Sequence, residues 1–339
     1  MKIAIDAMGG DYAPQEIVAG AVMAVGKLSQ ISKIFLVGDS GSIEKELAKH
    51  SYDSRKIEIR HASEVVEMSE TPAQAVRRKK DSSIGRAVDL VKNGEADAVV
   101  SAGNTGAVVV ASMLKLRTLS GVDRPAIAVI MPTPKRPFIL VDAGANTDCN
   151  AKLLLQFAVM GSVYSRIILA TGNPVVGLMS IGGEDSKGNE MTKEAFSLLG
   201  KSHLNFKGNV EGHDIFEGET DVIVCDGFVG NIVLKTSEST AYAIGRWMKT
   251  ELKKTPLRLL GAAVLFGALK TMKKRLDPEM YGGALLLGVN GVCIITHGKS
   301  SSKAIFHAIR VACDSVHHQL NHMIITEIAK LNYSSGKTA

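Results

Sequence analysis

Four short turns rich in glycine, asparagine and aspartate are the parts of this chain best suited to chemistry. They occupy residues 6–11, 102–106, 142–146 and 226–231, and each follows a predicted strand. Small residues let backbone N–H groups approach an anion, and the N-terminus of a following helix favours negative charge. In a parallel sheet the carboxyl ends of the strands share one edge, where ligands bind. The sequence therefore predicts that all four turns meet at one edge and bind an anion, although glycine and asparagine also occur in ordinary turns.

Two further polar segments, 182–189 and 205–212, add side-chain donors. The first holds one lysine, Lys187, among glycines, and the second contributes two asparagines. Together with the four turns they resemble a pocket for a phosphate-sized anion, rich in neutral donors and poor in histidine. The alternative for 182–189 is an ordinary surface loop.

Several common catalytic and binding motifs are missing from the sequence. It contains no Gly-x-Gly-x-x-Gly, no complete P-loop, no Gly-x-Ser-x-Gly and no His-Glu-x-x-His,. The four cysteines are far apart in the chain, which is typical of a reduced intracellular protein and not of a disulfide scaffold or zinc ribbon,. His317, His318 and His322 have no obvious third ligand. We therefore expect no metal and no cofactor.

The elements that must position these residues alternate between short β-branched runs and segments of helical period, as in a parallel sheet with crossover helices. Strands are predicted at 2–7, 33–38, 56–60, 98–101, 126–131, 138–141, 175–180 and 222–225. Helices are predicted at 14–28, 41–50, 72–93, 106–116, 150–165, 190–200, 230–254 and 302–331. The uncharged stretch 280–298 contains five glycines and is predicted to form strands and turns, so we expect a soluble protein. No linker separates two halves, and we predict a single three-layer α/β domain over 1–331, with a tail at 332–339.

The net charge of +6 is concentrated in one segment, because residues 246–276 hold nine basic residues and one acid. Thr255 and Pro256 form a helix start that divides this segment, so a helical hairpin is predicted at 238–276. Its apolar centre is too short to span a membrane and is followed by a basic rim. The residues expected to contact anionic lipid are Leu259, Leu260, Val264, Leu265, Phe266, Leu269, Lys270, Lys273 and Lys274. The alternative is a hairpin packed on a partner subunit. With 5% aromatic residues, the chain does not suit nucleic acid,.

Several ordered motifs of the chain resemble those of the bacterial acyl-ACP:phosphate acyltransferases (PlsX), over residues 1–320. The motifs occupy residues 3–11, 101–107, 142–146, 187–189, 205–212, and 226–231 followed by Lys235. Within the segment 182–189, residues 183–185 differ slightly from the pattern of the family. The residues after about 325 look specific to this chain.

The resemblance implies transfer of an acyl group from acyl carrier protein to inorganic phosphate. The acyl phosphate would feed a membrane glycerol-3-phosphate acyltransferase of phospholipid synthesis. It also implies a Rossmann-like αβα fold similar to phosphotransacetylase and isopropylmalate dehydrogenase. A cytoplasmic homodimer, peripherally associated with the inner face of the plasma membrane, is the expected state.

This reaction mainly requires that the phosphate and the thioester be held in position. Phosphate is already nucleophilic at neutral pH, and a thiol of pKa about 8.5 leaves without a strong general acid. The site then needs a phosphate cradle and donors for the oxyanion. As catalytic residues we predict Lys187, Asn189, Asp226 and Asn231. As phosphate-binding residues we predict Gly103, Asn104, Thr105, Gly106, Asn146, Asn209, Asp6, Asp11 and Asp142, with the aspartates orienting donors or accepting a phosphate proton.

A second basic run, made of Arg77, Arg78, Lys79 and Lys80, is predicted to receive the acidic face of acyl carrier protein, or else is a solvated helix face. Two other functions stay open. One is a phosphotransacylase that uses acyl-CoA, and the other is a non-catalytic membrane-docking scaffold that binds phosphate or acyl chains. Comparing turnover on acyl-CoA and on acyl carrier protein distinguishes the acyl-CoA enzyme from the acyl-ACP enzyme. A non-catalytic scaffold would not need so many anion-facing turns.

Overall fold

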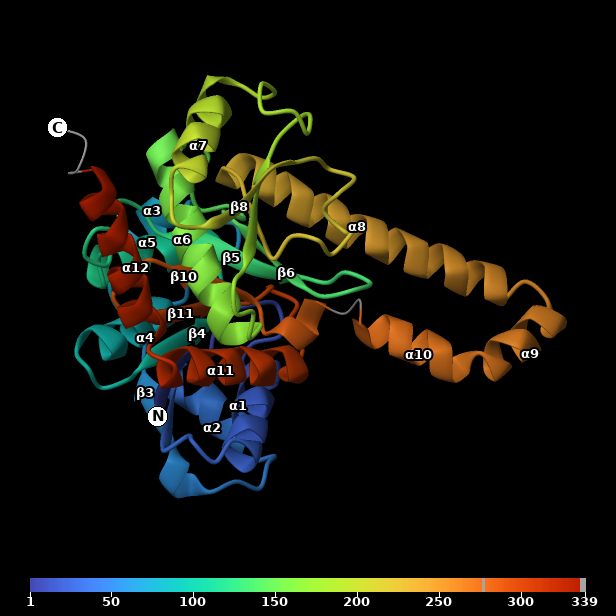
Figure 1. Ribbon diagram of the computed structural model, residues 1–339. Helices are drawn as coiled ribbons and strands as arrows, with labels where there is room; N and C mark the ends of the chain where they lie inside the picture. The colour runs from blue at the N-terminus through green and yellow to red at the C-terminus, as the bar shows by residue number, and fades with distance from the viewer. Residues whose placement is uncertain (276–277, 336–339) are drawn as a thin grey trace.

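The computed structural model describes residues 1–275 and 278–335, with the side chains of 1–272 and 279–331. Its centre is one continuous eleven-stranded sheet of strand order β3-β2-β1-β4-β11-β10-β5-β6-β9-β7-β8 (Figure 1). The strands are β1 (Lys2–Asp6), β2 (Lys33–Gly38), β3 (Ile57–His61), β4 (Ala98–Ser101), β5 (Ala126–Met131), β6 (Phe138–Val141), β7 (Val175–Met179), β8 (Asn205–Val210), β9 (Val222–Val224), β10 (Ala284–Leu287) and β11 (Val292–Ile295).

Helices cover both faces of the sheet and make the three layers that the sequence predicts. One face packs on α1 (Gln15–Lys27), α2 (Ser40–Leu47), α6 (Ala151–Ile168), α7 (Glu190–Gly200), α11 (Ser302–His317) and α12 (Leu320–Ser335). The other packs on α3 (Pro72–Arg78), α4 (Ser83–Lys92), α5 (Thr105–Lys115) and the first turns of α8 (Gly227–Leu252). Because both faces are buried, central strands such as β4 and β6 are apolar at nearly every position,.

The sheet reverses direction near its middle. β1, β2, β3, β4 and β11 are parallel, and β10 is antiparallel to both β11 and β5. β6 is antiparallel to β5, and β9, β7 and β8 follow β6 in parallel. The carboxyl ends of β1, β4 and β11 therefore lie at one edge, here called the β4 rim. The carboxyl ends of β6, β9, β7 and β8 lie at the opposite edge, the β9 rim.

All eight predicted strands are confirmed, and β10 and β11 occupy the stretch predicted to form strands and turns. The strand β8 was missed because its sequence is polar and contains Gly208. The predicted helix 72–93 is wrong in its continuity, since α3 ends at Arg78 and α4 starts at Ser83. The predicted helix 302–331 is likewise two helices, separated at Gln319, whose φ is 51°. Helix α12 continues through Ser335, so part of the expected tail is helical.

A long helical arm extends away from the body, as Figure 1 shows. It consists of α8, the short α9 (Pro256–Val264) and α10 (Phe266–Arg275), and a 3-10 turn at Pro278–Tyr281 leads back to β10. Thr255 caps α9 and Pro256 starts it, as the sequence predicts. The second part of the hairpin is not one helix, because α9 ends at Val264 and α10 begins at Phe266.

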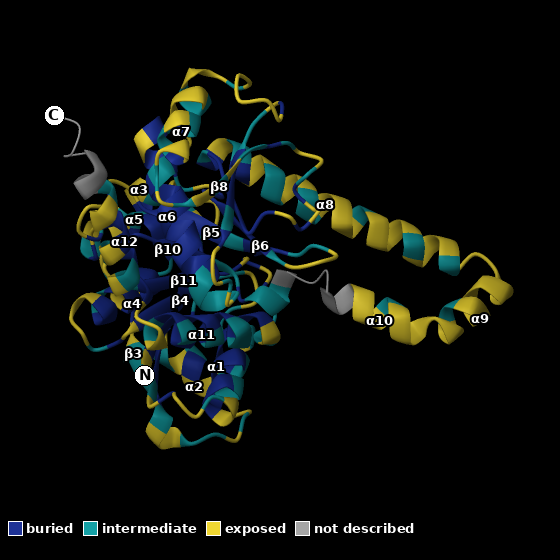
Figure 2. Cartoon of the chain, in the orientation of Figure 1, coloured by how far each residue is buried: buried dark blue, intermediate teal, exposed yellow. Residues whose placement is uncertain are grey.

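Beyond the first turns of α8, the described residues of the arm make few contacts with the rest of the chain. In α8 only Gly227 and Gly230 are buried, and α9 has no buried residue, which Figure 2 shows as a mostly yellow projection. Helix α6 is the one described helix with the length and composition of a membrane span, but 72% of it is buried, as expected for the core helix of a globular fold.

Candidate active site

The β9 rim is organised around the carboxylate of Asp142, which directly follows β6. Asp142 is fully buried and accepts five N–H groups. Oδ1 accepts from the backbone N of Ile127, Gly144 and Ala145 at 3.0–3.1 Å. Oδ2 accepts from the backbone N of Asn146 at 2.7 Å and from its Nδ2 at 2.9 Å. Asp142 therefore holds the 142–146 turn in shape and has little capacity left for a substrate.

The turn after β9 packs directly against the turn after β6. The backbone N of Gly227 donates to the carbonyl of Asn146 at 2.7 Å. A Cβ on Gly227 would lie 2.6 Å from that carbonyl oxygen, and one on Gly230 would overlap the carbonyl of Asp142. Only glycine allows this approach. The N-cap Asp226 accepts the backbone N of Val229 at 2.9 Å through Oδ1, so it fixes the start of α8 at the rim,.

The lysine loop, residues 181–189, leaves the end of β7 at the same rim. Gly183 N donates to Glu211 Oε1 at 3.0 Å, and Asn209 Nδ2 donates to the carbonyl of Glu184 at 2.8 Å. Asn189 is the N-cap of α7, and its Oδ1 accepts the backbone N of Thr192 at 2.9 Å. The loop is thus anchored at both ends and in its middle.

Lys187 and Asn231 are predicted site residues that keep free donors at the β9 rim. Lys187 is half exposed, and its Nζ lies 3.9 Å from Glu184 Oε1, too far for a strong ion pair,. The Asn231 side chain is exposed and makes no hydrogen bond with a described group. Its side chain lies beside Gly144, where a Cβ would be 3.6 Å away. In contrast, the Asn146 Nδ2 group donates to both Pro125 O and Asp142 Oδ2 and has no free hydrogen.

Two polar atoms of the lysine loop's support are buried without a partner, namely Ser180 Oγ and Asn209 Oδ1. Ser180 directly follows β7, and a Cβ on Gly188 would lie 3.2 Å from its hydroxyl. Sequence reasoning passed over Ser180, although its position at a strand end beside the glycine loop was the available signal. Such unpaired buried groups are uncommon and are typical of functional sites.

The β4 rim is closed by its own hydrogen bonds. Ser101 Oγ donates to Asp6 Oδ2 at 2.7 Å and accepts the backbone N of Gly103 at 3.1 Å. A Cβ on Gly9 would lie 2.7 Å from Gly103 N, so the turns after β1 and β4 touch. Asp11 N donates to the carbonyl of Gly298 at 2.7 Å and brings in the turn after β11.

Asn104, predicted to hold phosphate, is already fully used at the β4 rim. Its Oδ1 caps α5 by accepting Ala107 N at 3.1 Å. Its Nδ2 donates to the carbonyls of Glu67, Met68 and Glu70 at 3.1–3.4 Å and so ties down the 67–70 loop. In this arrangement Asn104 is a positioning residue. The remaining polar groups of the rim include the exposed Thr105, the carboxylates of Asp6 and Asp11, and the exposed Lys299 in the turn after β11.

The prediction that all four turns share one edge is wrong, because the sheet reverses at β10 and again at β6. Along the strand direction, the six residues of β5 separate the two rims by about 17 Å, and the strands β11, β10, β5 and β6 lie between β4 and β9,. The residues gathered at the β9 rim are Asp142, Asn146, Lys187, Asn189, Asn209, Asp226 and Asn231. Those at the β4 rim are Asp6, Asp11, Gly103, Asn104, Thr105 and Gly106.

Burial raises the pKa of aspartates at both rims and of two cysteines at the β9 rim. It raises the pKa of Asp6, against hydrogen bonds from Ser83 and Ser101. It also raises the pKa of Asp142, against its N–H donors. At the β9 rim, burial together with the charges of Asp142 and Asp226 raises the pKa of Cys149 to about 11, and the same causes raise the pKa of Cys225. Neither thiol is therefore a ready nucleophile.

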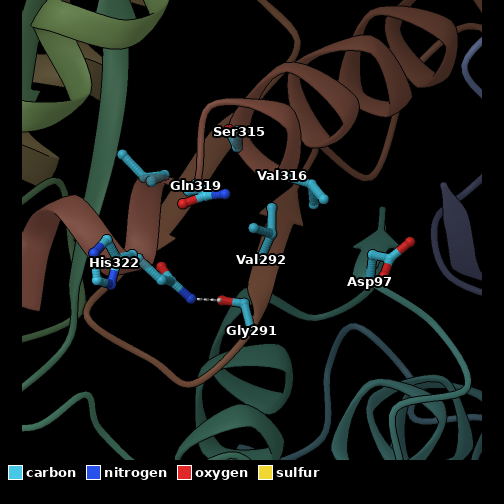
Figure 3. A pocket seen from close by; sticks show the side chains of 9 residues that line it. Asp97, Gly291, Val292, Ser315, Val316, Gln319 and His322 are labelled. Atoms are coloured by element: carbon cyan, nitrogen blue, oxygen red, sulfur yellow. Dashed lines mark hydrogen bonds between the residues drawn. The ribbon is translucent and has the colours of Figure 1, made fainter.

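No group of three metal-ligating side chains occurs among the side chains that the structure describes, and His317, His318 and His322 form none. A cavity of about 340 Å³ lies elsewhere, at the start of β4 and β11 beneath the α11–α12 corner (Figure 3). Its lining includes Asp97, Gln319 and His322 but none of the predicted site residues.

The predicted docking surfaces are exposed in large part. Arg77, Arg78 and Lys80 are exposed at the end of α3, whereas Lys79 is half buried and donates to Glu70 Oε2 and Val65 O, both at 2.6 Å. Lys79 is thus a structural residue of this loop. In the hairpin, Leu259, Leu260, Val264, Leu265, Phe266 and Lys270 are exposed and Leu269 is half buried. The side chains of Lys273 and Lys274 lie outside the described residues.

Comparison with known proteins points to one family. The model of the family described as "Fatty acid synthesis protein" matches residues 1–323. A phosphate acyltransferase from Pelotomaculum thermopropionicum is 51% identical over 331 residues, covering 98% of this chain and 96% of the relative. Another from Geobacter sulfurreducens is 49% identical over 324 residues, covering 96% and 93%.

Solved structures agree on the fold. A phosphotransacetylase from Streptococcus pyogenes superposes with a TM-score of 0.64 at 18% identity and covers 94% of both chains. A 4-hydroxythreonine-4-phosphate dehydrogenase from Klebsiella pneumoniae superposes with a TM-score of 0.51 at 16% identity, covering 95% of this chain and 99% of that one. The predicted Rossmann-like αβα class, similar to the phosphotransacetylase fold, is confirmed.

Proposed function

The chain belongs to the fatty acid synthesis protein family of phosphate acyltransferases, and we propose that it transfers a long-chain acyl group from acyl carrier protein to inorganic phosphate at the β9 rim. The observation that carries this location is the presence of free donors at the β9 rim, namely Lys187 Nζ in the loop after β7 and the Asn231 amide in the first turns of α8. The N-terminus of α8 favours an anion, whereas the β4 rim, beside its Lys299, would confront phosphate with Asp6 and Asp11,.

In the proposed reaction a phosphate oxygen attacks the thioester carbonyl. A C–O bond forms, and the carbonyl electrons move to oxygen, where Lys187 and Asn231 stabilise the charge. The carbonyl then re-forms as the C–S bond breaks, and the carrier leaves as a thiolate. Asp226, with one oxygen committed to Val229 N, has its second oxygen free to accept a proton from dihydrogen phosphate, and that proton returns through solvent to the thiolate,.

The test is a trapping assay. The purified protein is incubated with palmitoyl-acyl carrier protein and phosphate, and acyl phosphate is captured by hydroxylamine as the hydroxamate. We expect hydroxamate that depends on phosphate and on the carrier thioester, with much less from palmitoyl-CoA. Equal turnover on both thioesters would favour the acyl-CoA phosphotransacylase, and no product from either would favour the non-catalytic scaffold.

The membrane part of the proposal concerns the hairpin. Its exposed apolar residues and following basic residues suit shallow insertion among anionic headgroups, each basic residue adding about 1 kcal/mol,. This would keep the protein cytoplasmic but bound to the inner face of the plasma membrane, close to the glycerol-3-phosphate acyltransferase that consumes acyl phosphate. Replacing Lys270, Lys273, Lys274 and Arg275 by Gln should weaken sedimentation with anionic liposomes, and unchanged binding would contradict insertion.

Two partner contacts complete the proposal. A second copy of the chain covers the long, unpartnered α8 in a homodimer, which sedimentation equilibrium tests directly. Acyl carrier protein docks on the exposed Arg77, Arg78 and Lys80. Reversing these three charges should raise the KM for the carrier substrate and leave the KM for phosphate unchanged, whereas an unchanged carrier KM would move the docking surface elsewhere.

A further inference from the structure

Three large apolar side chains are exposed at the β9 rim, outside the hairpin tip. Ile181 is 83% exposed, Phe228 is 60% exposed and Ile232 is 50% exposed. They belong to the two elements that carry the free donors, the lysine loop and the first turns of α8. Side chains of this size are normally buried in a fold whose sheet is covered on both faces, so their exposure beside polar donors is informative.

Neighbouring strands bring these segments together. β7 pairs with β9, so the loop after β7, which contains Ile181, and the first turn of α8, which contains Phe228, leave adjacent strands at the β9 rim. Phe228 and Ile232 are four residues apart on α8 and lie on the same helical face,. On the other side of β9, the turn after β6 contacts the same helix, because Gly227 N donates to the carbonyl of Asn146 and Gly144 lies beside the Asn231 side chain.

Ile181 is held in position although its side chain is exposed. Ser180 N donates to the carbonyl of Val210 at 2.9 Å, and Gly183 N donates to Glu211 Oε1 at 3.0 Å. A Cβ on Gly182 would lie 2.7 Å from Lys187 Cγ, so the loop folds back and its lysine lies over the residues next to Ile181. The apolar side chain and the lysine are thus fixed relative to each other.

A fatty acyl thioester likewise has a polar group next to an apolar chain. Its carbonyl needs a polar donor, and its second and later carbons need an apolar surface directly beside that donor. Asn231 lies between Phe228 and Ile232 in sequence, and Ile181 and Lys187 belong to the same loop. At the β4 rim the exposed large apolar side chains are Met68, beside Gly298, and Tyr12, directly after the turn that follows β1, and they belong to two separate segments.

We infer that Ile181, Phe228 and Ile232 form the seat for the first carbons of the acyl chain and set the preference for chain length, here called the acyl seat. This inference rests on the proposed acyl transfer at the β9 rim. The seat acts on the thioester substrate and makes no contact with phosphate. Each methylene group that it covers should tighten the acyl donor by about fourfold.

The test compares donors of different length. Hydroxamate formation is measured with acetyl-, octanoyl- and palmitoyl-acyl carrier protein for the wild type, Phe228→Ala, Ile232→Ala and Phe228→Leu. We expect Phe228→Ala to raise the KM for the octanoyl and palmitoyl donors about tenfold, to change the acetyl donor little and to leave the KM for phosphate unchanged. Phe228→Leu should restore most of the loss. Leu114→Ala, on the exposed face of α5, is the matched control and should change nothing.

The outcomes separate the seat from the proposed function. If the wild type makes hydroxamate and the seat variants keep its chain-length preference, the seat is wrong and the proposed function stands. If the variants lose activity equally on all three donors and sediment as smaller particles, the three side chains are contacts between copies of the chain, which also overturns the seat. If the wild type makes no hydroxamate from any donor, the proposed function fails and the seat with it.

Discussion

The two rims of the sheet look alike in sequence but differ in what their polar groups are doing. Both consist of glycine-rich turns with an aspartate at the strand end, Asp6 at the β4 rim and Asp142 at the β9 rim. At the β4 rim Asn104 binds three carbonyls of the neighbouring loop, and the acidic Asp11 is exposed. At the β9 rim a lysine and an amide remain free. Each rim has an exposed lysine, Lys299 or Lys187, so the difference lies in the asparagines: Asn104 is committed to structure, whereas Asn231 keeps its amide free for a substrate.

The largest expected effect is the difference in kcat between a variant that lacks the lysine of the β9 rim and one that lacks the lysine of the β4 rim. Lys187→Ala removes the free cation of the β9 rim and should lower kcat by about 10²–10³, as expected for a donor to the oxyanion. Lys299→Ala removes an exposed lysine of the β4 rim and should change kcat less than twofold. Hydroxamate formation under saturating substrates measures both. A similar loss in the two variants would erase the distinction between the rims.

Replacing the two buried aspartates should separate the rims in stability. Asp142 accepts four backbone N–H groups, which cannot turn round to accept a hydrogen from an introduced amide, and the side-chain amide of Asn146, which could do so only by giving up its bond to Pro125 O,. We expect Asp142→Asn to lower the free energy of unfolding by about 3 kcal/mol. Asp6 accepts partly from serine hydroxyls, which can rotate, so Asp6→Asn should cost about 1 kcal/mol,. Urea denaturation followed by circular dichroism gives both values, and equal losses would contradict the argument.

Two asparagine caps allow a matched comparison of smaller size. Asn104 caps α5 and Asn189 caps α7, each with Oδ1 on a backbone N–H at 3.1 and 2.9 Å. Each change to Ala should cost about 1 kcal/mol of stability. Only Asn189→Ala should also lower activity, because that cap fixes the end of the lysine loop. If Asn104→Ala lowered kcat more than its stability loss explains, phosphate binding at the β4 rim would return as the better interpretation.

The smallest effect concerns the pH dependence of Asp6. Burial raises its pKa in the folded protein, so the stability that it contributes is present at acid pH and is lost as the pH rises above the unfolded value of about 4,. The advantage of the wild type over Asp6→Asn in urea denaturation should therefore shrink as the pH rises. The exposed Asp11→Asn is the control on the same rim. An advantage that grew with pH would mean that the hydrogen bonds outweigh burial.

Most of the fold could be predicted because its signals are local. The β-branched runs of the eight predicted strands alternate with segments of helical period, and Thr255-Pro256 marks a helix start without reference to the rest of the chain,. The helix breaks at 79–82 and at Gln319 were missed because no proline or glycine marks them. β8 was missed because Asn205, Lys207 and Asn209 give it a polar pattern, and its place at the edge of the sheet tolerates that pattern.

The sequence by itself determined which residue types could handle an anion, where the turns lie, and that a basic apolar hairpin stands apart from a nearly neutral body. Only the tertiary structure decided which of those turns act together. The antiparallel direction of β6 is local, because residues 132–137 join it to β5 as a hairpin, but the place of β11 and β10 between β4 and β5 depends on strands far along the chain,. The free or committed state of Asn104, Asn146 and Asn231 likewise depends on carbonyl groups far away in sequence. Hydrogen-bond partners and strand order are long-range properties, so the chemistry of one glycine-rich turn cannot be inferred from its composition alone.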